Sequence, residues 1–187
     1  VRLLRDNDTV TGAELLVPEA LSCRSEVSPE SVAACLSLNT EDIRTEVHRP
    51  VVASVGLPFL IAELASREAL RRCVPNLQGF RATLPLDGAV SLYAYTLDTN
   101  ADEPHDVQAR MFTPRMTEDP ATGSATAAAT ALLALHRNKT TLNLNVSQGV
   151  DMGRASVLFA GYDASSGEAV VRVGGNCVMT LEGTFSL

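Results

Sequence analysis

The feature that most constrains the fold is a long uncharged segment, from Pro120 to Leu135, that is rich in alanine. We expect a helix that begins near Gly123, and no position around its circumference carries a charged side chain. A helix that is apolar on every side is buried on every side, because no face of it gains from contact with water. Its alanines let neighbouring backbone approach closely, so we expect a curved sheet to enclose it.

Short strands are predicted on both sides of this helix, separated by turns rich in Gly, Asp and Ser. Two short helices are also expected, one over 28–38, where Ser28 and Pro29 make a good start, and one over 66–73. The pattern is that of an α+β protein with a rolled, mostly antiparallel sheet around a central buried helix. The predicted strands are 51–55, 59–64, 89–97, 107–112, 142–147, 156–160, 169–173 and 177–181.

The two ends of the alanine-rich helix differ in charge. His136, Arg137 and Lys139 stand at its far end, where the helix dipole favours cations. Its near end is therefore a buried positive terminus with free N–H groups, and Gly123 leaves room for a ligand to approach them. Such a terminus binds anions readily, so we expect it to suit the carboxylate of a small molecule.

Asp119 and Ser124 place a proton acceptor and a hydroxyl at the same helix start. These residue types also serve as ordinary N-terminal caps, and spacing alone does not separate a cap from a binding site. The surrounding letters match neither a phosphate-binding loop, which needs a following lysine, nor the nucleophile elbow of the α/β-hydrolases. From the residues alone, both the cap and the ligand site stay open.

The composition argues against several other functions. A formal net charge of −7 leaves no basic surface for the phosphates of nucleic acids. The uncharged segment is shorter than the roughly 20 apolar residues of a membrane-spanning helix, and no export signal opens the chain. The four cysteines form no CxxC pair and the three histidines are not spaced for ligation. We therefore expect no metal, no cofactor, no membrane partner, reduced thiols and a cytoplasmic protein.

Two motifs stand out around the alanine-rich helix. Residues 110–114 read RMFTP and 118–125 read EDPATGSA, and after the helix residues 148–154 read QGVDMGR. These stretches resemble the PhzF-like family of phenazine-biosynthesis isomerases, whose EDPATGSA signature is matched letter for letter. Weaker similarity in layout extends over nearly the whole chain, so the resemblance is specific.

The resemblance implies the fold of diaminopimelate epimerase, in which two similar halves, each a rolled sheet around a helix, meet at an active-site cleft. It implies a cofactor-independent isomerase or epimerase of a small amino- or hydroxy-acid, acting by proton transfer at carbon. The catalytic side chains that it implies are Asp119 and Ser124. The substrate-binding residues that it implies are Thr122, Gly123, Gln148 and Gly149.

The sequence also departs from the family pattern. The family's N-terminal half supplies a glutamate and a histidine in a Gly-His pair, and neither motif occurs here. We therefore expect one domain over residues 1–187 that corresponds to the C-terminal half, with the N-terminal half absent. Roughly the first 40 residues would be the connection and first helix, and the last strand would cross to the absent half. Because proton transfer between carbons needs a base within reach of both, we predict that the isolated chain is inactive.

Two functions from different classes stay open. The first is the isomerase or epimerase, of which this chain carries part of the active site. The second is a non-catalytic carboxylate-binding or assembly module derived from half of such an enzyme. Under either hypothesis an uncovered apolar face favours association. The expected partners are therefore a small-molecule carboxylate together with a second copy of the chain or a separate N-terminal half.

Overall fold

The computed structural model describes residues 1–99, 104–178 and 180–184. In chain order its strands are β1 (Arg2–Asp6), β2 (Thr9–Leu16), β3 (Ser22–Glu26), β4 (Ile43–Arg44), β5 (Val51–Ser54), β6 (Pro58–Leu64), β7 (Leu92–Thr96), β8 (Val107–Phe112), β9 (Glu118–Asp119), β10 (Thr141–Gln148), β11 (Ser156–Asp163) and β12 (Val170–Asn176). Its helices are α1 (Pro29–Leu36), η1 (Thr40–Asp42), α2 (Arg67–Arg72), α3 (Leu77–Thr83) and α4 (Gly123–His136).

The strands of the described residues join in one mixed sheet. Its order is β1-β2-β12-β11-β10-β8-β7-β6-β5-β3, with β4 paired to β6 and β9 paired to β8. Two of the pairs are parallel, β6 with β7 and β8 with β10. Parallel neighbours need a crossover connection, and here the helices supply it. The chain passes through α2 and α3 between β6 and β7, and through α4 between β8 and β10.

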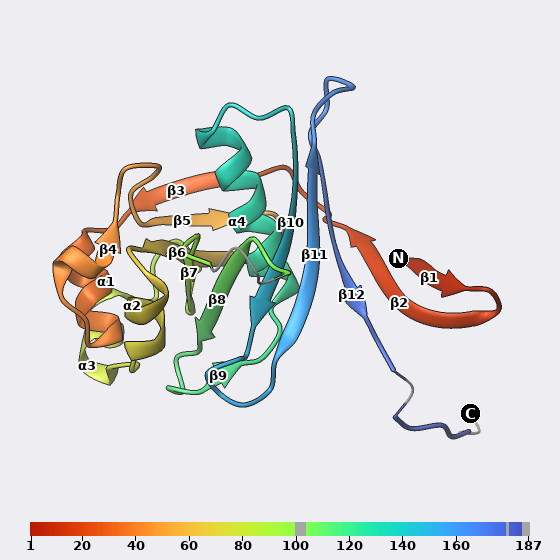
Figure 1. Ribbon diagram of the computed structural model, residues 1–187. Coiled ribbons are helices and arrows are strands. Elements are labelled where there is room, and N and C mark those ends of the chain that lie inside the picture. The colour runs from red at the N-terminus through yellow and green to blue at the C-terminus, as the bar shows by residue number, and fades with distance from the viewer. Residues whose placement is uncertain (100–103, 179, 185–187) are drawn as a thin grey trace.

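The crossovers place helices on both faces of the sheet (Figure 1). Each face has its own hydrophobic core. Alternate residues of β6 point to opposite faces, as the pleat of a strand requires. Phe59 and Ile61 belong to the core around α4, whereas Leu60 and Ala62 belong to the core under α1, α2 and α3. The prediction of a sheet around one helix therefore described the face that carries α4 and missed the face that carries α1, α2 and α3.

The alanine-rich segment forms α4, and every residue from Ala125 to Ala134 is buried. The helix contacts β5 and β6 on one side and β10, β11 and β12 on the other. The predicted start of α1 is also confirmed, because the Ser28 side chain accepts a hydrogen bond from the Ser31 N–H and Pro29 opens the helix. Hydrophobic periodicity and capping residues were sufficient to place both helices.

The two ends of the chain differ from the prediction. All the predicted strands except the last are present, but Cys177, Val178 and residues 180–181 lie outside any strand. Met179 lies outside the described residues. The sequence analysis missed β1 and β2, which form a hairpin that projects from the body of the molecule (Figure 1). Because β2 pairs with β12, this hairpin is part of the main sheet.

A buried polar chain lies in the α4 core, beside the last turn of that helix. The His48 ring is 5.7 Å from the ring of His136, and burial lowers the pKa of His48. In the neutral ring, Nδ1 donates to the Arg49 carbonyl at 2.8 Å, so Nε2 accepts from the Tyr95 hydroxyl at 2.6 Å. The Tyr95 hydroxyl also lies 3.4 Å from Oε2 of Glu63. Burial raises the pKa of Glu63, which favours its protonated form.

We expect Glu63→Gln to flatten the dependence of stability on pH. The folded protein keeps the buried Glu63 carboxyl protonated at pH values where the unfolded chain has lost that proton. This contribution to stability is full below pH 4.5, the ordinary pKa, and is lost as the pH rises through the raised folded pKa. Each unit by which the pKa differs between the folded and unfolded states corresponds to about 1.4 kcal/mol of unfolding free energy.

The measurement is urea unfolding of wild type and Glu63→Gln from about pH 4 to about pH 8. The unfolding free energy of the wild type should fall more steeply over this range than that of the variant. Glu41→Gln, at an exposed position, removes a carboxylate without changing a buried group and serves as the control. Equal slopes for wild type and Glu63→Gln would contradict the prediction.

Candidate functional site

The two sequence motifs meet at the start of α4. Asp119 lies in β9, opposite Met111 of β8, and a three-residue loop leads from it into the helix. Gln148 is the last residue of β10, and Gly149 begins the turn toward β11. Because β8 carries both β9 and β10 as neighbours, the EDPATGSA loop and the QGVDMGR turn are held side by side.

Gln148 joins the two motifs by hydrogen bonds. Its side-chain oxygen accepts from the Thr122 N–H at 3.1 Å. Its side-chain nitrogen donates to the Asp119 carbonyl at 2.7 Å and to the Thr122 hydroxyl oxygen at 2.9 Å. The Thr122 hydroxyl in turn donates to Oδ2 of Asp119 at 2.6 Å. The carboxyl of Asp119 is thereby fixed in orientation.

Gly149 lets the two motifs approach each other closely. Its φ is +79°, and a Cβ at this position would lie 2.2 Å from the Arg154 carbonyl oxygen and 2.9 Å from that of Pro120. The turn is closed by a hydrogen bond from the Arg154 N–H to the Gly149 carbonyl at 2.9 Å. Both the backbone conformation and the lack of space therefore require glycine.

The N-terminus of α4 has no side-chain cap. Thr122 occupies the N-cap position, but its hydroxyl is directed to Asp119 and accepts nothing from the helix. Within the described residues, no group accepts a hydrogen bond from the N–H of Gly123 or Ser124. The ordinary capping interpretation is thus not the one that the structure adopts. These N–H groups carry the positive end of the helix dipole and are available to an anion.

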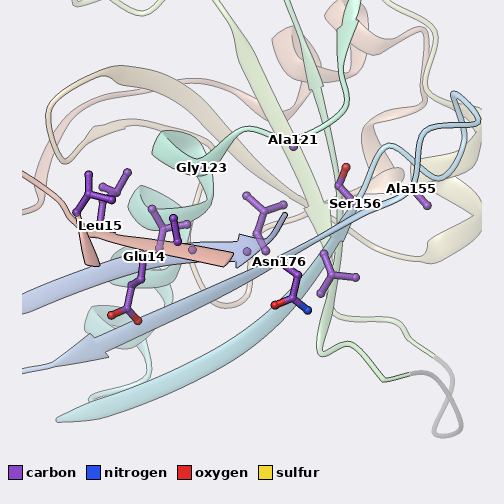
Figure 2. Close-up of a pocket in the computed structure, with 14 residues that line it drawn as sticks. Glu14, Leu15, Ala121, Gly123, Ala155, Ser156 and Asn176 are labelled. Carbon is purple, nitrogen blue, oxygen red and sulfur yellow. The ribbon is translucent and has the colours of Figure 1, made fainter. Parts of the chain in front are cut away.

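Gly123 borders two cavities at this end of the helix. The larger, about 580 Å³, lies over β2, β11 and β12, and its walls include Ala121, Ser156 and Asn176 (Figure 2). The smaller, about 320 Å³, is bordered by Ser124 and has mostly apolar walls. Those walls are formed mainly by Leu15, Val17, Pro18, Val55, Leu57 and Val173.

The structure brings some of the expected site residues together and separates others. Thr122, Asp119 and Gln148 form one hydrogen-bonded group, whereas Gly123 and Ser124 face the cavities. Asp119 lines neither of these two cavities, and within the described residues the Ser124 hydroxyl forms no hydrogen bond. Of the two expected catalytic side chains, Ser124 therefore borders a cavity and Asp119 does not.

Two acidic residues near the site were missed by the sequence analysis. Glu19 lines the smaller cavity together with Ser124. Glu14 borders the larger one, but its carboxylate points away from Gly123 and pairs with Arg2 at 3.0 Å (Figure 2). Neither residue belongs to a motif. Glu14 lies in β2, which the pairing with β12 brings near α4, and Glu19 lies in the segment that follows β2.

The first letter of the signature has a structural role. Glu118 forms a two-point ion pair with Arg110, at 2.7 and 3.0 Å, and both side chains are largely buried. Arg110 also stacks over Phe112 and donates to backbone carbonyls at the end of α2. The pair fixes β9 to β8 and α2. Asp119, the next residue in β9, is therefore held on a rigid support. Breaking a buried pair by removing one partner is strongly destabilising.

Metal ligands, apolar helices and cysteines bear on other kinds of site. No group of three or more potential metal ligands is present among the described residues. In the same part of the chain, no helix has both the length and the apolar character needed to cross a membrane. All four cysteines are free. Burial raises the pKa of Cys73 to about 12, which disfavours its thiolate as a nucleophile.

A family model for phenazine biosynthesis-like proteins, PhzC-PhzF, matches residues 5–183. The chain belongs to this family. An uncharacterized isomerase from Mesorhizobium japonicum is 32% identical over 176 residues, which are 89% of this chain and 57% of the relative. This PhzF-family chain therefore spans little more than half the length of that relative.

Solved structures agree at the level of the fold. A PhzF-family phenazine biosynthesis protein from Bacillus anthracis superposes with a TM-score of 0.76 at 21% identity, over 88% of this chain and 57% of the other. A predicted epimerase from Pseudomonas aeruginosa gives a TM-score of 0.67 at 26% identity, over 93% and 58%. The PhzF fold is thus matched along nearly the whole chain.

The expectation of an absent N-terminal half is wrong. The family match begins within β1 and the fold match covers 88% of the chain, so the first residues are part of the family fold. The physical reason is the pairing of β2 with β12, which makes the front of the chain a component of the sheet. The prediction that the isolated chain is inactive depended on the absent half, and it has no support in these findings.

We expect Gly149→Ala to destabilise the protein by on the order of 3 kcal/mol, because the new Cβ is strained in φ and collides with two carbonyl oxygens. Gly153 provides a matched control. Its φ is +78°, but a Cβ there would meet nothing within 4 Å. Gly153→Ala should therefore lower the free energy of unfolding only by the cost of the backbone conformation, about 1 kcal/mol. Urea unfolding of both variants measures the difference, and equal losses would show that the close approach at Gly149 is unimportant.

Proposed function

We propose that this protein is an isomerase or epimerase that transfers a proton at a carbon atom of a small amino- or hydroxy-acid. The observation that carries the proposal is the uncapped start of α4. There Gly123 and Ser124, whose N–H groups have no acceptor among the described residues, border cavities, and Asp119 is held in a fixed orientation one loop away. Membership of the PhzF-like family and the isomerase name of one relative support it.

In the proposed complex, the carboxylate of the substrate binds at the positive end of α4. The N–H groups of Gly123 and Ser124 donate to it, and the Ser124 hydroxyl provides a further donor. Anchoring the carboxylate fixes the neighbouring carbon, which carries the proton to be moved. A negative group at a helix N-terminus also gains from the dipole, so binding should favour the ionised acid.

Asp119 is the proposed proton-transferring group on this chain. A carboxylate accepts a proton from carbon in one step and returns it in another, and each step requires hydrogen-bonding distance to the reacting position. Glu19, which lines the cavity beside Ser124, is a second carboxylate that could reach the substrate from another side. An isomerase that moves a proton between two positions benefits from such a pair.

A carboxylate-binding module without catalysis is the second candidate. One observation favours it, because Asp119 lines neither of the two cavities that border Gly123. In that case the start of α4 would bind an acid whose carbon-bound protons do not exchange. The two candidates thus differ in whether bound acids incorporate deuterium from the solvent.

The test is to incubate the protein with a panel of small amino- and hydroxy-acids in heavy water and follow deuterium incorporation by mass spectrometry. We expect exchange in at least one acid, and a loss of about 100-fold or more with Asp119→Asn, because general acid–base groups contribute that much. Ser124→Ala should mainly weaken binding, which NMR titration of the same acids measures.

Asp163→Asn is the matched control, since this aspartate is at the far end of β11 and hydrogen bonds to Ser165. It should exchange like the wild type. Binding without exchange by the wild-type protein would support the binding module instead. Neither binding nor exchange across the panel would contradict both candidates.

A further inference from the structure

Gln148 is the buried centre of the contact between the two motifs. None of its side chain is exposed. One hydrogen of its amide group goes to the Asp119 carbonyl and the other to the Thr122 hydroxyl, and its oxygen accepts from the Thr122 N–H. An amide has two hydrogens to donate, so Gln148 has no donor left for a bound ligand.

The chemistry of the partners fixes the direction of each of these hydrogen bonds. The Thr122 N–H is a donor, so it faces the oxygen of Gln148, and this excludes the flipped amide. The amide nitrogen then donates to the Thr122 hydroxyl oxygen. Having accepted, the hydroxyl directs its single proton to Oδ2 of Asp119, 2.6 Å away. No other arrangement satisfies all the groups.

The two carboxyl oxygens of Asp119 are therefore not equivalent. Oδ2 accepts from Thr122, whereas Oδ1 has no hydrogen-bond partner among the described residues. In the same part of the chain, Oε1 of Glu63 is the one fully buried side-chain oxygen without a hydrogen-bond partner. It follows that Oδ1 of Asp119 retains contact with solvent. Of the two oxygens, Oδ1 is thus the one whose hydrogen-bonding capacity is unused within the described residues.

We propose that Gln148 is a positioning residue, which fixes the Thr122 hydroxyl as a donor to Asp119 and leaves Oδ1 as the oxygen that exchanges protons. This inference rests on the proposed function, because it assumes that Asp119 transfers a proton. It gives Gln148 and Thr122 a role other than the direct substrate contact that the family resemblance implies. Both act on the reaction through Asp119.

The test compares Gln148→Met and Thr122→Val, which abolish the ordered donor, with Thr122→Ser, which keeps it. In the deuterium assay, the first two should lose at least about 10-fold in exchange rate, whereas the affinity for the acid stays within about two-fold. Thr122→Ser should retain both rate and affinity. A residue that binds substrate directly would instead lose affinity on substitution.

A second measurement does not depend on any activity. The carboxyl carbon of Asp119 is followed by NMR in protein labelled at aspartate, at one neutral pH, with Asp119→Asn for assignment. Its resonance should move in Gln148→Met and Thr122→Val and stay in place in Thr122→Ser. Thr130→Val is the control, because Thr130 is a buried threonine of α4 whose hydroxyl donates to the Thr126 carbonyl, away from the site. It should leave the Asp119 resonance unchanged.

These readouts separate the possible failures. If the wild type exchanges no acid, the proposed function fails, and the Asp119 resonance alone decides whether Gln148 orders the donor. An unchanged resonance in folded Gln148→Met overturns the proposal, as does a parallel loss of affinity and rate. If Gln148→Met does not fold, the comparison of Thr122→Val with Thr122→Ser decides, and equal resonances in these two overturn it.

Discussion

The complete burial of α4 is the constraint on which the rest of the structure depends. A helix without charge on any face needs neighbours on every side, and the sheet supplies them by curving from β5 and β6 round to β10, β11 and β12. Small alanine side chains allow this close enclosure. Because the helix is enclosed along its length, ligands reach it only at its ends. The N-terminal end borders the cavities, and the C-terminal end adjoins the buried chain of His48, Tyr95 and Glu63.

Some residues of the two motifs hold the loop before α4 in place, and others border the cavities. Glu118 anchors the loop through Arg110, while Gln148 and Gly149 hold it against the turn after β10. Ala121, Gly123 and Ser124 are the letters that border the cavities. Most residues of the motif thus have a structural role. This division explains why the signature is long although few of its residues are placed to meet a ligand.

Local patterns in the sequence predicted α1, α4 and most of the sheet, because capping residues and periodicity act within a few residues. The β1–β2 hairpin was missed because its residues are largely exposed and depend on β12 for pairing. The strand predicted at 177–181 had suitable apolar residues, but Val178 is 84% exposed, and local preference alone does not make a strand. At the site, the motif identified the neighbourhood of Asp119. The role of Gln148 required knowing that β8 pairs with both β9 and β10.

The position of α4 in the chain order has a consequence for folding during synthesis. The helix lies between strands that precede it and strands that follow it, and β12 ends at Asn176. When the ribosome has just released α4, its contacting strands β10, β11 and β12 have not yet been made. The apolar helix therefore stays partly uncovered until the last strand emerges, and during that interval it is exposed to aggregation and to chaperones. Long-range pairing of this kind is also slow. The same enclosure that gives the native protein its site thus makes the nascent chain vulnerable late in translation.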